Sequence, residues 1–171
     1  LKKVKSEDLE EVMLLLEGRI FPRQDDSEIG IANKTMLKAI SLATGESKSK
    51  IESEWKKTGD LGTVSFNLIK KKKQATLARE NLTLKKVLKN LKELASIEGL
   101  GSINKKISLI AELLTSAQPA EAKYIVRTIL SDMRIGVGEG TIRDAIVWAN
   151  FGEKLNIKYD EKEHKVDIED R

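Results

Sequence analysis

Cysteine is absent from this chain of 171 residues, so no disulfide can form and no thiolate is available for catalysis or zinc binding. We therefore expect an intracellular setting. Only two prolines and 4% aromatic residues are present, which is typical of an all-helical chain. No apolar run has membrane-spanning length and no charged-then-apolar leader occurs, so we expect a soluble protein. The first residue is leucine, which indicates a fragment of a longer polypeptide.

Sequence features of a catalytic site are also missing. The one histidine, His164, lies in a charged tail, where a solvated side chain is expected. Acidic residues are scattered, and no Gly-Lys-Ser/Thr phosphate loop occurs. Lys158 and Lys165 each approach a Lys-x-Asp-Gly pattern but lack its glycine, and nothing predicts the burial that would lower the pKa of either amine. We predict no catalytic residue and no metal site in this chain.

Positive charge is concentrated in the middle of the chain, although the net charge of the whole is only +4. Residues 66–106 carry 11 Lys/Arg and 3 Asp/Glu, whereas acidic residues slightly outnumber basic ones on either side. A local basic field attracts polyanions, most commonly nucleic acid, but a solvated lysine face has the same composition. The lysines are Lys70, Lys71, Lys72, Lys73, Lys85, Lys86, Lys89, Lys92, Lys105 and Lys106.

Apolar residues recur at three- and four-residue spacing along most of the chain, which predicts amphipathic helices. We expect a helical domain over residues 1–152 and a charged tail over 153–171, where alternation after residue 153 indicates a short strand pair or an exposed strip. One helix should end at Gly45, and another should occupy residues 47–57. Helix starts are predicted at Ser6, Asn33 or Thr35, Thr63, Thr83, Ser102, Pro119 and Thr141.

A glycine-rich turn joins the two amphipathic segments within residues 119–149. Gly136, Gly138 and Gly140 leave its backbone with little side-chain cover, and Thr141 is placed to begin the next helix. Bare N–H groups at a helix start, beside Arg134, suit a phosphate. An ordinary helix–helix corner would use glycine for backbone geometry alone, so both interpretations stay open.

Two internal similarities indicate a repeat. Residues 29–43 align without a gap with residues 135–149, and residues 60–64 resemble residues 99–103. Each puts a glycine before a Thr or Ser that can begin a helix. The predicted fold class is therefore all-α, a multi-helix domain of two pseudo-symmetric helical halves, unless the similarity is chance. Such halves could present their helix starts to the two strands of a duplex without reading bases.

Six short motifs occur in a recognisable order across residues 7–150. The longest are Glu121–Arg127 and Met133–Ile142, and the others are Gly18–Pro22, Ile29–Ile31, Thr58–Gly62 and Gly101–Ile107. Together they resemble the N-terminal DNA-binding domain of ATP-dependent DNA ligases of the archaeal and eukaryotic replicative type. The resemblance implies an all-α domain that grips the minor-groove side of nicked duplex DNA during replication, repair and recombination.

The same resemblance implies which residues contact DNA. They are Gly62, Thr63, Gly101, Ser102, Lys105, Arg134, Gly136, Gly138, Glu139, Gly140, Thr141 and Arg143. The nucleotidyl lysine, ATP and Mg²⁺ would belong to a part of the ligase beyond this chain, so the fragment should bind DNA without sealing it. A sliding clamp could bind the full-length protein. The expected location is the cytoplasm near the nucleoid if the source is archaeal, and the nucleus if it is eukaryotic.

Two other functions remain open. A helical protein-interaction scaffold would explain the internal similarity by stacked helix pairs, although only two units over 100 residues apart are visible. A small enzyme without a recognised motif would instead show a pocket with perturbed acids or bases.

Overall fold

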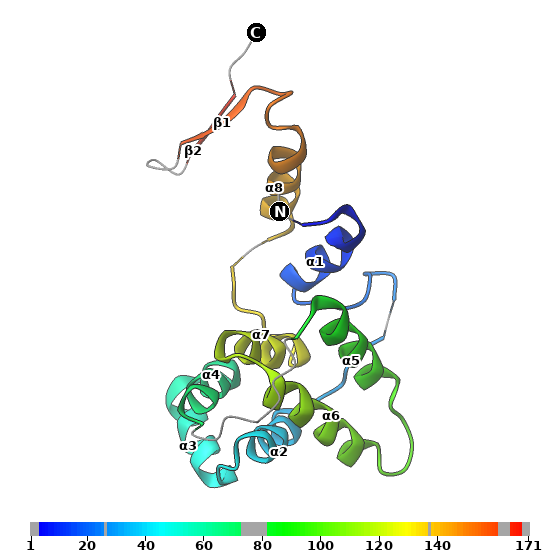
Figure 1. Ribbon diagram of the computed structural model, residues 1–171, viewed down its shortest axis with the longest axis vertical. Helices are drawn as coiled ribbons and strands as arrows, with labels where there is room; N and C mark the ends of the chain where they lie inside the picture. The colour runs from blue at the N-terminus through cyan, green and yellow to red at the C-terminus, as the bar shows by residue number, and fades with distance from the viewer. Residues whose placement is uncertain (1–3, 26, 73–81, 137, 161–164, 169–171) are drawn as a thin grey trace. The chain divides into compact units, whose positions relative to one another are not determined.

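The computed structural model describes residues 4–25, 27–72, 82–136, 138–160 and 165–168. These residues form α-helices, followed near the C-terminus by one two-stranded antiparallel hairpin (Figure 1). The predicted all-α fold is confirmed, and the alternation after residue 153 corresponds to the strand pair. No described helix is both long and apolar enough to cross a membrane.

The chain divides into two compact units, each considered by itself. Gly18–Arg134 form the larger one. It contains α2 (Asn33–Thr44), α3 (Lys48–Thr58), α4 (Leu61–Lys71), α5 (Leu84–Ser96), α6 (Ser102–Ser116) and α7 (Pro119–Ile129). Within it, α2 packs along α6 and α4 packs along α7, while α3 touches both α2 and α4 (Figure 1).

The core of this larger unit is aliphatic. Burying a leucine or isoleucine side chain stabilises the fold by about 1.5–3 kcal/mol, so these residues supply most of the driving force for folding. The stripes predicted for α2, α5, α6 and α7 all contribute to this core. Its largest fully buried side chains include Met36, Ile40, Ile51, Val64, Leu91, Leu94, Ile110, Leu113, Leu114 and Val126.

Leu1–Glu17 and Ile135–Arg171 form the smaller unit. It contains a 3₁₀ turn (Ser6–Asp8), α1 (Leu9–Leu16), α8 (Glu139–Phe151), β1 (Ile157–Asp160) and β2 (Lys165–Ile168). The strands pair with Ile157 opposite Ile168. No residue of α1 is fully buried, and Ile142 is the one buried hydrophobic residue among those described in this unit. The smaller unit therefore has little core of its own.

Most predicted helix ends agree with the structure. Helix α2 begins at Asn33 and is terminated after Thr44 by Gly45, which has a left-handed φ of 77°. The Thr83 hydroxyl caps α5 as predicted, and the helix predicted over 47–57 is α3 over 48–58, with the Ser47 hydroxyl as its cap. Helices α6 and α7 begin at Ser102 and Pro119 as predicted.

Three predicted helix starts are wrong by two or three residues. Helix α4 begins at Leu61 and not at Thr63, because the Asp60 carboxylate caps it. Helix α8 begins at Glu139 and not at Thr141, with Gly138 as its N-cap. Ser6 lies in the 3₁₀ turn before α1. In α4 and α8 the second helical residue is a glycine. Because glycine is a poor helix former, the sequence pattern predicted that each helix begins only after it.

Candidate nucleic-acid interface

The start of α4 is organised by one buried carboxylate. Helix α3 ends at Gly59, which adopts a left-handed φ of 66°. Asp60 follows, and its Oδ1 accepts the Gly62 N–H at 2.9 Å while its Oδ2 accepts the Thr63 hydroxyl at 2.5 Å. An aspartate at this position satisfies N–H groups that a helix start leaves unpaired.

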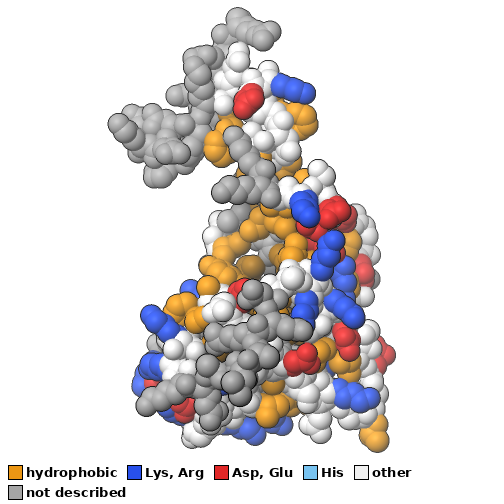
Figure 2. All heavy atoms as spheres, viewed as in Figure 1, with side chains coloured by type: hydrophobic (Ala, Val, Ile, Leu, Met, Phe, Trp, Pro, Cys, Tyr) orange, Lys and Arg blue, Asp and Glu red, His pale blue; other side chains and the backbone are white. Residues whose placement is uncertain are grey.

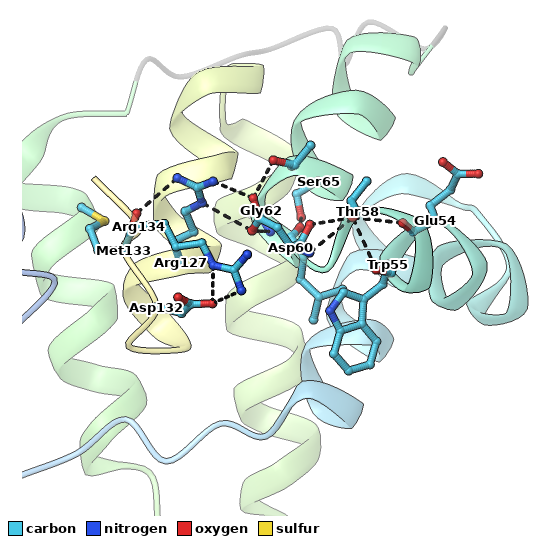
Figure 3. Close-up of polar contacts among 12 residues, drawn as sticks. Glu54, Trp55, Thr58, Asp60, Gly62, Ser65, Arg127, Asp132, Met133 and Arg134 are labelled. Carbon is cyan, nitrogen blue, oxygen red and sulfur yellow. Dashed lines mark hydrogen bonds and ion pairs between the residues drawn. The ribbon is translucent and has the colours of Figure 1, made fainter. Parts of the chain in front are cut away.

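Arg127 of α7 pairs with the same carboxylate across 67 residues of sequence (Figure 3). Its Nη2 donates to Asp60 Oδ2 at 2.6 Å and its Nε to Oδ1 at 3.4 Å. Both side chains are about nine-tenths buried. Burial alone would raise the pKa of Asp60, but the hydrogen bonds from Arg127, Thr63 and Gly62 and the charge of Arg127 together hold that pKa well below its ordinary value.

Arg127 also fixes the turn that follows α7. Its Nη1 donates to the carbonyl oxygen of Met133 at 3.2 Å, and its own carbonyl accepts the Asp132 N–H at 2.8 Å. Ser131 and Arg134 adopt left-handed φ values of 54° and 51°, which non-glycine residues rarely do. The Asp60–Arg127 pair thus fastens the α4 start to the turn that carries Arg134.

Arg134 is half-exposed and paired within its own turn. Its Nε donates to Asp132 Oδ2 at 2.8 Å, and its Nη2 lies 2.7 Å from the same oxygen as an ion pair. The hydrogen bond to Asp132 raises the pKa of Arg134, so the guanidinium stays charged at any physiological pH. The predicted contact residue Arg134 is therefore accessible, but a carboxylate holds one edge of its guanidinium.

A hollow of about 180 Å³ lies where these segments meet, and we call it the polar hollow. Two of its carboxylates face two of its guanidinium groups, so its charges balance. The start of α2 contributes to its wall beside the α4 start and the Arg134 turn. Its lining residues are Asn33, Trp55, Gly59, Asp60, Leu61, Gly62, Arg127, Leu130, Asp132 and Arg134.

The structure gives Gly62 a packing role. A Cβ atom there would lie 2.7 Å from both the Lys123 carbonyl oxygen and Arg127 Cγ, so only glycine lets α4 and α7 approach this closely. Its N–H group, which we expected to face a phosphate, donates to Asp60 instead. The Thr63 hydroxyl also donates to Asp60, although Thr63 itself is only partly buried. DNA contacts at Gly62 and Thr63 stay predictions, but the Gly62 N–H group that suggested them is already hydrogen-bonded to Asp60.

The predicted contacts at the start of α6 are open to solvent. Gly99 and Gly101 adopt left-handed φ values of 82° and 80°, and nothing lies within 4 Å of a Cβ built on either. Lys105 is exposed, Ser102 is partly exposed, and no side chain caps the helix start. The backbone at this turn is therefore accessible, as a phosphate contact requires.

Lys106 connects this turn to the approach to α2. Its Nζ donates to the Ile29 carbonyl oxygen at 3.0 Å, four residues before α2 begins. Like α6, helix α2 has no side-chain cap. Since Asn33 also lines the polar hollow, the α2 start lies between the α6 start and the Arg134 turn. None of the individually predicted contact residues lies at this start, although the similarity of residues 29–43 to the glycine turn indicated that it could meet a duplex.

The remaining predicted contacts lie in the smaller unit. Gly136 has a left-handed φ of 63°, Gly138 is the N-cap of α8, and Gly140 is the second helical residue. A Cβ built on any of the three would meet nothing within 4 Å, and Gly140 and Thr141 are exposed. Arg143 is exposed too, with its Nη2 3.0 Å from Asp144 Oδ1. Glu139 begins the helix.

The first internal similarity extends to backbone geometry. The aligned residues Gly30 and Gly136 both have a φ of 63°, and the residues two positions later, Ala32 and Gly138, are extended N-caps. The second similarity does not, because Gly62 is helical and packed whereas Gly101 is a left-handed N-cap. The predicted symmetry between halves stays a prediction.

The central lysines have more than one role. Lys72 donates to the Ala43 carbonyl oxygen at 2.9 Å, and the Lys70 ammonium lies 6.0 Å from the centre of the Phe66 ring. On the face shown in Figure 2, basic and acidic side chains are intermixed. Lys73 lies outside the described residues. Some lysines thus hold helices together, and charge alone does not mark the interface.

Comparison with known proteins assigns the chain to a family. The family model described as DNA ligase N terminus matches residues 1–147. The chain belongs to the DNA ligase N-terminal family. A DNA ligase of Methanosphaera stadtmanae is 50% identical over 139 residues, covering 81% of this chain and 25% of that protein. DNA ligases of Archaeoglobus fulgidus and Thermococcus fumicolans are each 45% identical, covering 87% of this chain and 27% of their own length.

The ligase family resemblance seen in the sequence is thereby confirmed. This ligase N-terminal chain spans about a quarter of the length of the relatives it matches, and it aligns with their N-terminal part. The polar groups that organise its site, Asp60 and Arg127, lay inside recognised motifs, but their pairing was not predicted. An arginine within the apolar stripe of α7 was the available signal.

Proposed function

We propose that this chain is the DNA-binding part of an ATP-dependent DNA ligase. It holds nicked duplex DNA from the minor-groove side through the sugar–phosphate backbone, without reading sequence. The observation that carries the proposal is the family match over residues 1–147. The open starts of α2, α6 and α8 support it, because uncapped helix starts offer N–H groups and a partial positive charge to phosphates.

The proposal assigns contacts to residues of both units. In the larger unit they are the α6 start (Gly101, Ser102 and Lys105) and Arg134, with Gly62 and Thr63 at the α4 start. In the smaller unit they are Gly136, the segment from Gly138 to Thr141, and Arg143. Contacts of this kind position a protein on a duplex without selecting a sequence.

Sealing of the nick is assigned to the rest of the ligase. We propose that ATP and Mg²⁺ act there, together with the nucleotidyl lysine, so this chain binds nicked DNA but does not join it. Roles in replication, repair and recombination, a sliding-clamp partner and a location with the cell's DNA are part of the same proposal. They follow from ligase function and from no feature of this chain alone.

Fluorescence anisotropy of the chain with a labelled nicked duplex tests the binding. We expect similar affinity for several unrelated sequences and a steep loss of affinity as salt rises, because bound phosphates release counterions. R134A should weaken binding to all sequences about equally and reduce the salt slope by about one unit at most. K57A is the matched control, because it also removes a basic side chain that is ion-paired with a neighbouring acidic residue, Glu54. No binding at low salt, or strong sequence preference, would contradict the proposal.

A further inference from the structure

The Asp132–Arg134 contact occupies the part of Arg134 that a phosphate would use. One carboxylate oxygen, Asp132 Oδ2, accepts a hydrogen bond from Nε of the guanidinium and lies 2.7 Å from Nη2 as an ion pair. The Nε–Nη2 edge is one of the two edges with which arginine binds phosphate in a bidentate manner. Both side chains remain almost half exposed, at 44% and 48%, so an incoming anion reaches the pair from solvent.

The backbone holds Asp132 in this position. Its N–H donates to the Arg127 carbonyl oxygen, and Ser131 and Arg134, one residue before and two residues after it, have left-handed φ values. The next carbonyl, that of Met133, accepts from the buried Arg127 side chain. Since Arg127 is itself paired with Asp60, the turn cannot easily carry the Asp132 carboxylate away from Arg134.

The charges around the polar hollow do not favour an anion while this pair is closed. Asp60 neutralises Arg127, and Asp132 neutralises Arg134. A phosphate that approaches Arg134 therefore meets a guanidinium already satisfied on one edge, and a like charge 2.7 Å from its Nη2. An exposed ion pair is weak, so a phosphate can displace it, at the expense of affinity.

We propose that Asp132 competes with DNA phosphate for Arg134 and so limits how tightly the chain holds a duplex. This inference rests on the proposed DNA-binding function. An enzyme domain that grips any sequence must also release it, and a carboxylate built beside a contact arginine weakens the grip without removing the arginine. Asp132 is thus a residue that sets affinity through Arg134.

A double-mutant cycle tests the inference by anisotropy with one nicked duplex. We expect D132N to bind about two- to fivefold more tightly than the unmodified chain and to steepen its salt dependence by up to about one unit, because Arg134 becomes free to neutralise a phosphate. In the R134A background, D132N should have no effect. E52Q is the matched control, because it also removes one negative charge from an exposed pair, with Lys56, and should leave affinity unchanged.

The outcomes separate this inference from the proposed function. Equal or weaker binding by D132N, in a chain that itself binds DNA and loses affinity in R134A, would overturn the competition and leave the DNA-binding function intact. The same tightening by D132N with and without Arg134, or by E52Q, would reduce the effect to net charge and also overturn it. Absence of binding by the unmodified chain would overturn both. Urea unfolding of each variant confirms that the turn change leaves the fold intact.

Discussion

At the scale of single residues, the Asp60 carboxylate accepts hydrogen bonds from three different residues. It accepts from Gly62, Thr63 and Arg127 while being almost completely buried. The bonds from Gly62 and Arg127 satisfy donors that are buried away from water. Removing the charge would leave Arg127 as a buried cation without a counter-ion, which is among the most destabilising changes available to a folded chain.

We therefore expect D60N to lower the free energy of unfolding by about 3–5 kcal/mol at neutral pH. Because the pKa of Asp60 is lower in the folded chain than in the unfolded one, its stabilisation is complete above the ordinary carboxyl range. It is lost as pH falls below about 3.9 toward the folded pKa. The gap between D60N and the unmodified chain should accordingly shrink in acid, as urea titrations at neutral and acidic pH would measure.

The exposed pair of Asp144 with Arg143 provides the control for this experiment. D144N removes the same carboxylate charge from an ion pair, but both partners are about 70% exposed, so its unfolding should change little at either pH. A D60N chain as stable as the D144N chain at neutral pH would show that the buried pair does not hold α4 to α7.

At the scale of helices, two glycines occupy the same position with opposite surroundings. Gly62 and Gly140 are each the second residue of a helix. A Cβ at Gly62 would press into α7, whereas one at Gly140 would meet open space. We expect G62A to lower the free energy of unfolding by about 1–3 kcal/mol through overpacking.

G140A should be neutral or raise stability by up to about 1 kcal/mol, because alanine is the better helix former. Urea midpoints of the two variants, compared at equal m-values, measure the difference. Equal destabilisation by both would mean that glycine serves backbone geometry alone at these helix starts and that α4 and α7 do not meet as closely as the structure places them.

Sequence reasoning located helices well and their starts less well. The hydroxyl cap Thr83 and the terminating Gly45 act locally, so the sequence predicted both of them. The start of α4 was misplaced because Thr63 looked like a cap, while the actual cap is Asp60, which is also buried against Arg127 of α7. A choice between two local caps depended on a partner 67 residues away.

At the scale of the whole molecule, the two units differ in how much apolar surface they bury. The larger unit contains almost all of the described buried hydrophobic residues, and the smaller one contributes Ile142. Local opening is easiest where few apolar contacts are lost. We expect native-state hydrogen exchange to be slowest at amides of α4, α6 and α7 and markedly faster at those of α1 and α8.

Exchange by mass spectrometry on the chain alone, with fragments that cover each helix, measures this difference. Equal protection of α8 and α7 would contradict the division into a well-packed and a sparsely packed unit. Protection of α8 that rises only when nicked duplex DNA is added would instead agree with the proposed contacts from Gly138 to Thr141.

The sequence by itself determined the helical class, the boundaries that depend on local caps, and membership of the ligase N-terminal family, because periodicity and motif order are written along the chain. Only the tertiary structure decided which polar groups are buried and hydrogen-bonded inside the protein, and are therefore not accessible to a ligand. The recognised motifs contain both kinds of residue, and nothing in the motifs distinguishes them. Packing of α4 on α7 uses Asp60, Gly62 and Arg127, whereas Gly101 and Arg134 face solvent. Whether a residue is buried or exposed depends on which helices pack together, and this packing brings together segments that are distant in the sequence.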